Sequence, residues 1–213
     1  ANECVQNIVD DLMLLPSDVL ARQLIQGVPM KKNSLTNFLS GDNYALRPLH
    51  NFFFTRDAAV SLYNKVLISK MANPVRERES IIMETIFENH PSFGVSTMNP
   101  MNYPNSEGGD VLVARHDVLL IGIGARTSPQ GVDFLLNRLK VKEGIQHIIV
   151  QELPSKPESF IHLDMVFTFL DKNTCMVYEP LILKPNRYAT VHIKIDHGEV
   201  KKIENVKNIP EIL

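Results

Sequence analysis

Cysteine is scarce in this sequence, and long apolar runs are missing from it. The 213 residues include two cysteines, Cys4 and Cys175. Two are too few for a disulfide scaffold, and neither lies in a CxxC pair or beside a histidine at metal-ligand spacing. We therefore expect no cysteine-based metal site and a reducing compartment, the cytoplasm. No stretch approaches the roughly 18 apolar residues that a membrane helix needs, so we also expect no membrane-spanning segment.

An excess of charge of one sign is also lacking. The sequence has 22 basic and 24 acidic side chains, a net charge of −2 and a pI near 6.4. Such a balance supplies no basic field for a phosphate backbone, so we expect no nucleic-acid partner. The chain is long enough to bury a core without disulfides or metals. The composition predicts one globular domain, or one and part of another, with small-molecule partners.

The first half-hundred residues divide into a helical and a polar part. Apolar residues recur at helical spacing over residues 4–26, and Pro16 breaks the pattern, so we predict two short helices with Ser17 as the N-cap of the second. Residues 28–49 are polar and contain proline, glycine, aspartate and asparagine, which predicts a long ordered loop. A domain boundary is predicted near residue 30.

From residue 51 onward, short apolar runs alternate with helical patterns, which is typical of an α/β fold. The recurring unit is strand, strand, helix, strand. Helices are predicted over residues 74–89 and 130–139. Strands are predicted over residues 51–55, 65–70, 111–115, 118–123, 147–151, 163–170, 174–178, 191–195 and 200–203.

Four polar clusters lie at strand ends or turns: residues 51–57, 107–110, 122–127 and 162–164. Each has a plain structural alternative. The first fits a buried strand closed by an Arg-Asp turn, the second a hairpin turn with solvated carboxylates, and the fourth a structural His-Asp pair on one strand face. The third lacks the last glycine and the acidic residue of a dinucleotide-binding motif.

Together the clusters supply groups of complementary charge. If they converge, the site is electronegative at one end and cationic at the other. Such a site suits a zwitterion with a cationic head and a carboxylate tail, since carboxylates and guanidinium groups pair through forked hydrogen bonds. The contributing residues are Asp57, Glu107, Asp110, Asp164, His162, Arg76 and Arg126.

The motifs themselves, in this order and at these separations, resemble arginine deiminase, a family of the guanidine-modifying pentein superfamily. They are Phe-Thr-Arg-Asp at 54–57, Glu-Gly-Gly-Asp at 107–110, Gly-Ile-Gly-Ala-Arg-Thr-Ser-Pro-Gln at 122–130 and His-Leu-Asp-Met-Val-Phe-Thr at 162–168. The resemblance implies a partial α/β propeller of strand-strand-helix-strand units, a little over three of five. It also implies that residues 1–30 end a helical insertion domain and that residues 31–213 form part of the pentein catalytic domain.

The resemblance implies four catalytic residues. Asp57 and Asp164 would hold the substrate guanidinium between two carboxylates. His162 would be the general acid and base, oriented by Glu107. No metal or organic cofactor is implied.

The resemblance also implies residues that bind the remainder of the substrate. Asn51, Arg76 and Arg126 would bind its α-carboxylate and amino end. Phe54 would line the slot for its aliphatic stem, and Asp110 would support the site.

The implied reaction converts L-arginine to citrulline and ammonia through a covalent cysteine intermediate. The family's nucleophile lies in a glycine-rich stretch after the His-Leu-Asp motif, which has no match here. Cys175 is predicted to lie at a turn leading into a strand and to be structural. We therefore expect a piece of a longer protein, inactive by itself. A naturally truncated relative that only binds guanidino compounds is the alternative.

Other classes of function stay open. Exposed sheet edges would suit a protein-interaction module completed by another polypeptide. Amidino transfer and hydrolysis of agmatine or methylated arginine are the enzymatic alternatives. Arg76 and Arg126 together favour a ligand with a free carboxylate and disfavour agmatine. Whether the chain forms a homo-oligomer is not decided by the sequence.

Overall fold

The computed structural model describes residues 3–98, 104–139 and 145–213. The chain divides into two compact units, residues 1–54 and residues 55–213. The side chain of Cys4 lies outside the described part. The assignment of residues 1–30 to the end of a helical insertion stays a prediction.

The first unit consists of short elements with little core. Its elements are α1 (Glu3–Met13), α2 (Ser17–Gln26), β1 (Val28–Pro29), α3 (Leu35–Leu39) and β2 (Tyr44–Leu46), and β1 pairs with β2 in antiparallel fashion. The two predicted helices are confirmed, but Ser17 is the first residue of α2 rather than its N-cap, a position that Pro16 occupies without a side-chain hydrogen bond. The predicted loop over residues 28–49 contains a short helix between two paired strands.

The second unit contains a five-stranded sheet, a three-stranded sheet and a strand pair. The five strands are ordered β12-β11-β8-β7-β6 and the three β3-β4-β5, while β9 pairs with β10. The strands are β3 (Ala59–Leu62), β4 (Lys65–Ile68), β5 (Ser96–Met98), β6 (Val111–Arg115), β7 (Val118–Ile123), β8 (Ile145–Glu152), β9 (Phe167–Phe169), β10 (Cys175–Val177), β11 (Thr190–Asp196) and β12 (Glu199–Val206). The helices are α4 (Thr55–Ala58), α5 (Glu77–Asn89), α6 (Pro129–Leu139) and α7 (Glu179–Ile182), with 3₁₀ turns η1 (Pro74–Arg76), η2 (Gly108–Asp110), η3 (Glu158–Phe160) and η4 (Leu163–Met165).

The predicted strand-strand-helix-strand unit is found twice. In β3-β4-α5-β5 the first two strands are antiparallel and β5 is parallel to β4. The unit β6-β7-α6-β8 repeats this arrangement, with β8 parallel to β7. The α/β fold class is therefore confirmed, while the sheets are open and a propeller is not shown.

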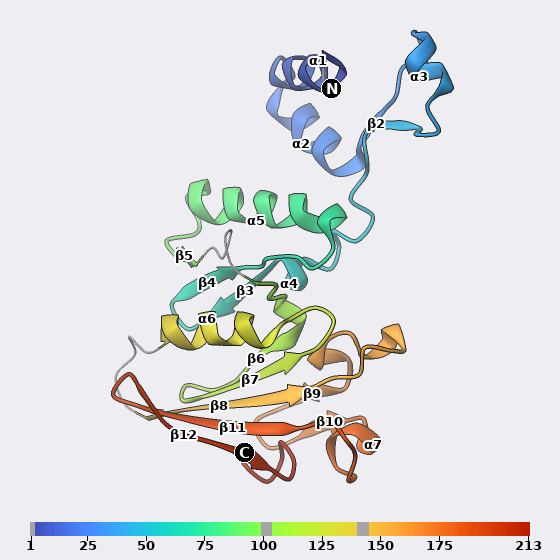
Figure 1. Ribbon diagram of the computed structural model, residues 1–213. Helices are drawn as coiled ribbons and strands as arrows, with labels where there is room; N and C mark the ends of the chain where they lie inside the picture. The colour runs from blue at the N-terminus through green and yellow to red at the C-terminus, as the bar shows by residue number, and fades with distance from the viewer. Residues whose placement is uncertain (1–2, 99–103, 140–144) are drawn as a thin grey trace. The chain divides into compact units, whose positions relative to one another are not determined.

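Strand β7 lies at the centre of the core. Leu119 and Ile121 pack on the side of α6, which lies across this face of the sheet (Figure 1). Leu120 packs on the opposite side, against Leu163 and Phe167. A strand covered on both faces needs apolar side chains at successive positions, which explains its continuous apolar run.

One predicted strand is wrong, and another, over residues 163–170, is confirmed only for β9; both errors fall on candidate site motifs. Residues 51–53 lie in a turn that leads into α4, and the Phe54 amide donates to the Asn51 carbonyl at 2.9 Å. Residues 163–165 form η4, because the Leu163 amide donates to the Asp110 side chain at 2.9 Å instead of to a neighbouring strand. In the described part of the chain, no helix has the length and apolarity to cross a membrane.

Candidate functional site

Three short turns of the second unit form the candidate site. Asp57 lies in α4, Glu107 directly precedes η2, and His162 directly precedes η4. All three side chains are buried. The structure brings together residues from each of the four sequence motifs.

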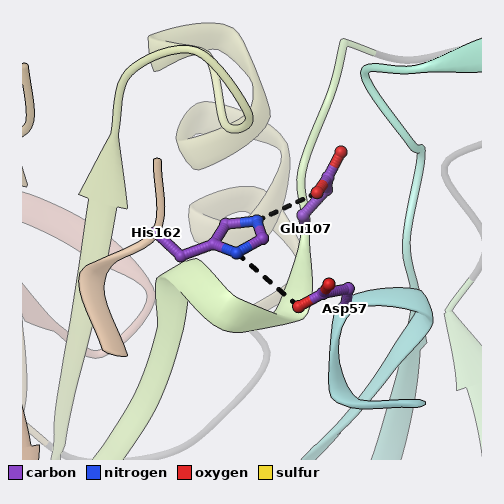
Figure 2. A group of neighbouring side chains, drawn as sticks. All are labelled: Asp57, Glu107 and His162. Atoms are coloured by element: carbon purple, nitrogen blue, oxygen red, sulfur yellow. Dashed lines mark hydrogen bonds and ion pairs between the residues drawn. The ribbon is translucent and has the colours of Figure 1, made fainter. Parts of the chain in front are cut away.

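The His162 ring lies between two carboxylates that face its opposite nitrogens (Figure 2). Its Nε2 lies 2.9 Å from Glu107 Oε2, and its Nδ1 lies 3.6 Å from Asp57 Oδ1. Only the protonated imidazole can donate from both nitrogens. This arrangement therefore favours the imidazolium form.

Burial alone would lower the pKa of His162, because it penalises the charged ring. The hydrogen bond to Glu107 and the negative charges of Asp110 and Asp57 outweigh burial, so the pKa of His162 is raised above its ordinary value. The site thus keeps a proton donor available near neutral pH.

Glu107 is fully buried and is held by Ala72 and by two adjacent residues, Arg126 and Thr127. Its Oε1 accepts a hydrogen bond from the Ala72 amide at 2.8 Å, and its own amide donates to Thr127 Oγ1 at 3.1 Å. Arg126 Nη1 lies 3.7 Å from the same carboxylate. These contacts exclude a solvated hairpin turn for the Glu-Gly-Gly-Asp motif, and they explain why the Arg-Thr of the third motif belongs to the site.

Glycine is required where the turns approach one another. A methyl group on Gly109 would lie 2.7 Å from His162 Cγ and Nδ1. One on Gly122 would lie 2.5 Å from Asp110 Oδ1. The glycines of the second and third motifs therefore serve close packing beneath the imidazole and the carboxylate, and they do not form a nucleotide loop.

Asp110 lies beneath the site and links η2 to η4. Its Oδ1 accepts the hydrogen bond from the Leu163 amide at 2.9 Å, and the side chain is fully buried. Burial raises the pKa of Asp110 to about 7, although His162, Thr127 and Leu163 oppose the rise. Asp110 thus positions the backbone beside His162. This position agrees with the predicted role of Asp110 as support of the site.

Arg76 is buried among carboxylates. Its Nη1 contacts Asp57 Oδ2 at 2.7 Å, and its Nη2 contacts Glu79 Oε2 at 2.7 Å. Burial lowers the pKa of Arg76, but these two partners outweigh it and raise the pKa overall. Glu79 is not among the residues predicted from the sequence, although its spacing of three residues from Arg76 is the signal of a helical ion pair. Binding of a substrate carboxylate by Arg76 stays a prediction.

Asp164 lies at the accessible side of the cluster. Its side chain is 29% exposed, and its Oδ2 lies 3.6 Å from Arg56 Nε. Burial raises the pKa of Asp164, while His162 and Arg56 oppose the rise. The alternative in which His162 and Asp164 share a strand face is wrong, because η4 begins between them.

Two predicted substrate-binding residues belong to the first unit. Phe54 is the last residue of this unit and Asn51 lies three residues before it. Phe54 is exposed in a tilted ring pair with Phe53. Their predicted contacts with a substrate stay predictions.

The same three side chains have donor atoms that could in principle ligate a metal ion. Asp57, Glu107 and His162 offer ligand atoms within 4.8 Å of one another. The two carboxylates face opposite ring nitrogens, however, so one ion on either nitrogen would sit away from one of them. Arg76 also occupies the outer oxygen of Asp57. The positions of the carboxylates therefore suit contacts with an imidazolium and an organic cation better than coordination of a metal ion.

Sequence comparison identifies relatives of the chain. It is 31% identical over 231 residues to an arginine deiminase of Bacillus cytotoxicus and 31% identical over 228 residues to one of Bacillus cereus. Each alignment covers 100% of this chain and 55% of the relative. The chain therefore spans about half the length of these relatives.

Solved structures with a similar fold include the product-bound N-terminal domain of ArgZ, an arginine dihydrolase from cyanobacteria. Its TM-score is 0.53 at 24% identity, covering 63% of this chain and 48% of that domain. Unliganded AgrE matches with a TM-score of 0.52 at 25% identity, covering 62% of this chain and 18% of AgrE. The ArgZ likeness concerns the fold alone. Since the family model for arginine deiminase matches residues 4–213, the chain belongs to the arginine deiminase family.

Proposed function

We propose that this chain forms the guanidino-binding and acid-base part of a hydrolase that converts L-arginine to citrulline and ammonia. The proposal rests on one observation. The carboxylates of Asp57, Glu107 and Asp164 gather around the buried imidazole of His162. Family membership supports it, because the curated relatives are arginine deiminases.

We propose that charged side chains of the site bind the oppositely charged groups of the substrate. The carboxylates of Asp57 and Asp164 would take the guanidinium through forked hydrogen bonds. Arg126, whose side chain is 23% exposed, would bind the α-carboxylate. Since Arg76 is already held by Asp57 and Glu79, selectivity for L-arginine over agmatine would depend mainly on Arg126.

The proposed chemistry has two steps. A cysteine thiolate attacks the guanidinium carbon, a carbon–nitrogen bond breaks, and His162 gives its proton to the departing ammonia. Neutral His162 then removes a proton from water, the resulting hydroxide attacks the same carbon, and the carbon–sulfur bond breaks to restore the thiolate. The hydroxyl proton of the product passes to ammonia, so that citrulline and ammonium are released. Glu107 stabilises the imidazolium in its working orientation.

The nucleophile is proposed to lie outside residues 1–213. Cys175 lies in β10 opposite Phe169 and packs against the apolar cluster that contains Leu163 and Phe167, a position suited to a structural cysteine. The isolated chain would then bind L-arginine without turning it over. We also propose a cytoplasmic enzyme, in which the thiol stays reduced, and a pentein propeller to which this chain contributes its open sheets.

Citrulline release from L-arginine tests the proposal, measured for this chain and for a longer natural form of the protein. Turnover is expected in the longer form alone. Asp164→Ala in that form should abolish turnover while thermal unfolding stays cooperative. An active Asp164→Ala variant would contradict the role of Asp164, and absence of turnover in a folded longer form would contradict the hydrolase.

A non-catalytic guanidino-binding protein is the second candidate function. The position of Cys175 in a paired strand favours it, since the acid groups of the site are present without a suitable nucleophile among the described side chains. Saturable L-arginine binding by the longer form, without citrulline release, would select this candidate.

A further inference from the structure

The two acids proposed to bind the guanidinium each have an arginine neighbour, but the two pairs differ. Asp57 pairs with Arg76 at 2.7 Å, and the side chains are 12% and 8% exposed. Asp164 lies 3.6 Å from Arg56, and these side chains are 29% and 48% exposed. Asp57 is thus fixed in the interior, whereas the orientation of Asp164 depends on a partner at the surface of the site.

Arg56 is itself anchored to the turn that carries Glu107. Its Nη2 donates a hydrogen bond to the Val111 carbonyl at 2.8 Å, directly after η2. A methyl group on Gly108 would lie 1.9 Å from the Arg56 carbonyl oxygen, so the backbone of α4 also contacts η2. The guanidinium therefore bridges the end of η2 and the acid of η4, and its planar fork suits two acceptors at fixed positions.

We propose that Arg56 is a positioning residue that holds the Asp164 carboxylate ionised and oriented toward the substrate guanidinium. This inference rests on the proposed function of Asp164 in guanidinium binding. Arg56 acts through Asp164 and does not contact the reacting atoms.

The charged groups around Asp164 explain how Arg56 keeps its carboxylate ionised. Burial raises the pKa of Asp164, and the nearby carboxylate of Asp57 raises it further. His162 and Arg56 are the two groups that lower it. When His162 loses its proton during the reaction, Arg56 becomes the remaining cation of this set that keeps Asp164 charged.

The inference is tested by the pKa of Asp164, measured by carbon-13 NMR in this chain and assigned with Asp164→Asn. In Arg56→Gln the pKa of Asp164 should rise, and Arg56→Lys, which keeps the charge but not the fork, should produce a smaller rise. L-arginine binding at neutral pH should weaken about two- to fivefold in Arg56→Gln, the factor that a partly exposed ion pair supplies. An unchanged Asp164 pKa in folded Arg56→Gln would overturn the inference.

A second measurement changes Asp164 and leaves Arg56 intact, so it can be made even if Arg56→Gln does not fold. In Asp164→Asn, hydrogen exchange at Arg56 Nε should be faster than in the wild type, because the carboxylate partner is lost. Equal exchange would overturn the inference. Both measurements report on the contact between Arg56 and Asp164 and need no turnover. A failure of the proposed function would therefore appear separately: the pKa of Asp164 would still respond to Arg56, but the chain would not bind L-arginine.

Discussion

At the scale of single residues, the candidate site requires glycine at particular positions as well as its charged side chains. The space below His162 is filled by the backbone of η2, and only glycine leaves room for the imidazole there. The motifs predicted which charged side chains come together in this region. The sequence could not show that Gly109 lies against His162, because this contact joins residues more than 50 positions apart.

Gly109→Ala tests this close packing. The added methyl group would lie 2.7 Å from His162, so the ring must move away from Glu107. We expect L-arginine binding to fall at least tenfold, as about 1.4 kcal/mol of lost interaction would produce, with the pKa of His162 lower than in the wild type. Gly94→Ala is the matched control, since nothing lies within 4 Å of its added methyl group. Wild-type binding by Gly109→Ala would contradict the packing argument.

Asp110→Asn tests the buried acid. The pKa of Asp110 is raised to about 7 from an ordinary 3.8, so its neutral form contributes stability that is complete below about 3.8 and lost as the pH rises through 7. The amide stays neutral and can still accept the hydrogen bond from Leu163. The free energy of unfolding should therefore decline less between pH 5 and 8 in Asp110→Asn than in the wild type.

Asp110→Ala provides the control for that experiment, because it removes the acceptor and leaves the Leu163 amide unpaired. It should cost about 1–3 kcal/mol of unfolding free energy across the whole pH range. If Asp110→Asn and the wild type showed the same pH dependence in chemical denaturation, the raised pKa of Asp110 would be contradicted.

At the scale of elements, the sequence predicted the regular parts of the second unit and missed its irregular ones. Periodicity identified β7, β8, α5 and α6, whose apolar faces enter the core. It placed a strand over residues 51–55 and missed β3, because three consecutive phenylalanines resemble a buried strand, yet Phe53 is 72% exposed. Turns η2 and η4 depend on the hydrogen bond between Asp110 and Leu163, a tertiary contact that periodicity does not report.

A histidine pair joins two strands of the five-stranded sheet. His147 Nδ1 of β8 and His192 Nε2 of β11 lie 2.8 Å apart, so one ring donates and the other accepts. Burial, then the neighbouring His147, lowers the pKa of His192, with Lys202 acting in the same direction and Glu204 opposing it. The pair therefore stabilises the fold best when His192 is neutral.

His192→Gln tests this pair. Because the pKa of His192 in the folded state lies below its ordinary 6.5, its contribution to stability is complete above about 6.5 and lost as the pH falls below that value. The melting temperature of the wild type should fall more between pH 7 and 5 than that of His192→Gln. Parallel pH profiles for the two proteins would rule out the effect.

At the scale of the whole molecule, the two units differ in how much core they contain. The three apolar clusters all draw their residues from the second unit. Among the described side chains of residues 8–54, those classed as buried are Gly27 and Leu49 alone. A unit of this size with so small a core is marginal by itself.

Separate expression of residues 55–213 and residues 1–54 tests this difference. The longer fragment should unfold cooperatively on heating, at a temperature close to that of the whole chain, as followed by circular dichroism. The shorter fragment should show no cooperative transition. A cooperative transition in residues 1–54 would contradict the account of its core.

The central claim is that this cluster binds a guanidinium against the carboxylates of Asp57 and Asp164. The most direct test is a titration of the chain with L-arginine while the His162 ring signals are followed by NMR. The claim predicts that these signals shift and saturate in the wild type and that Asp164→Asn shifts only at far higher concentrations. His162 signals that stay unchanged in the folded wild type at saturating millimolar L-arginine would contradict it.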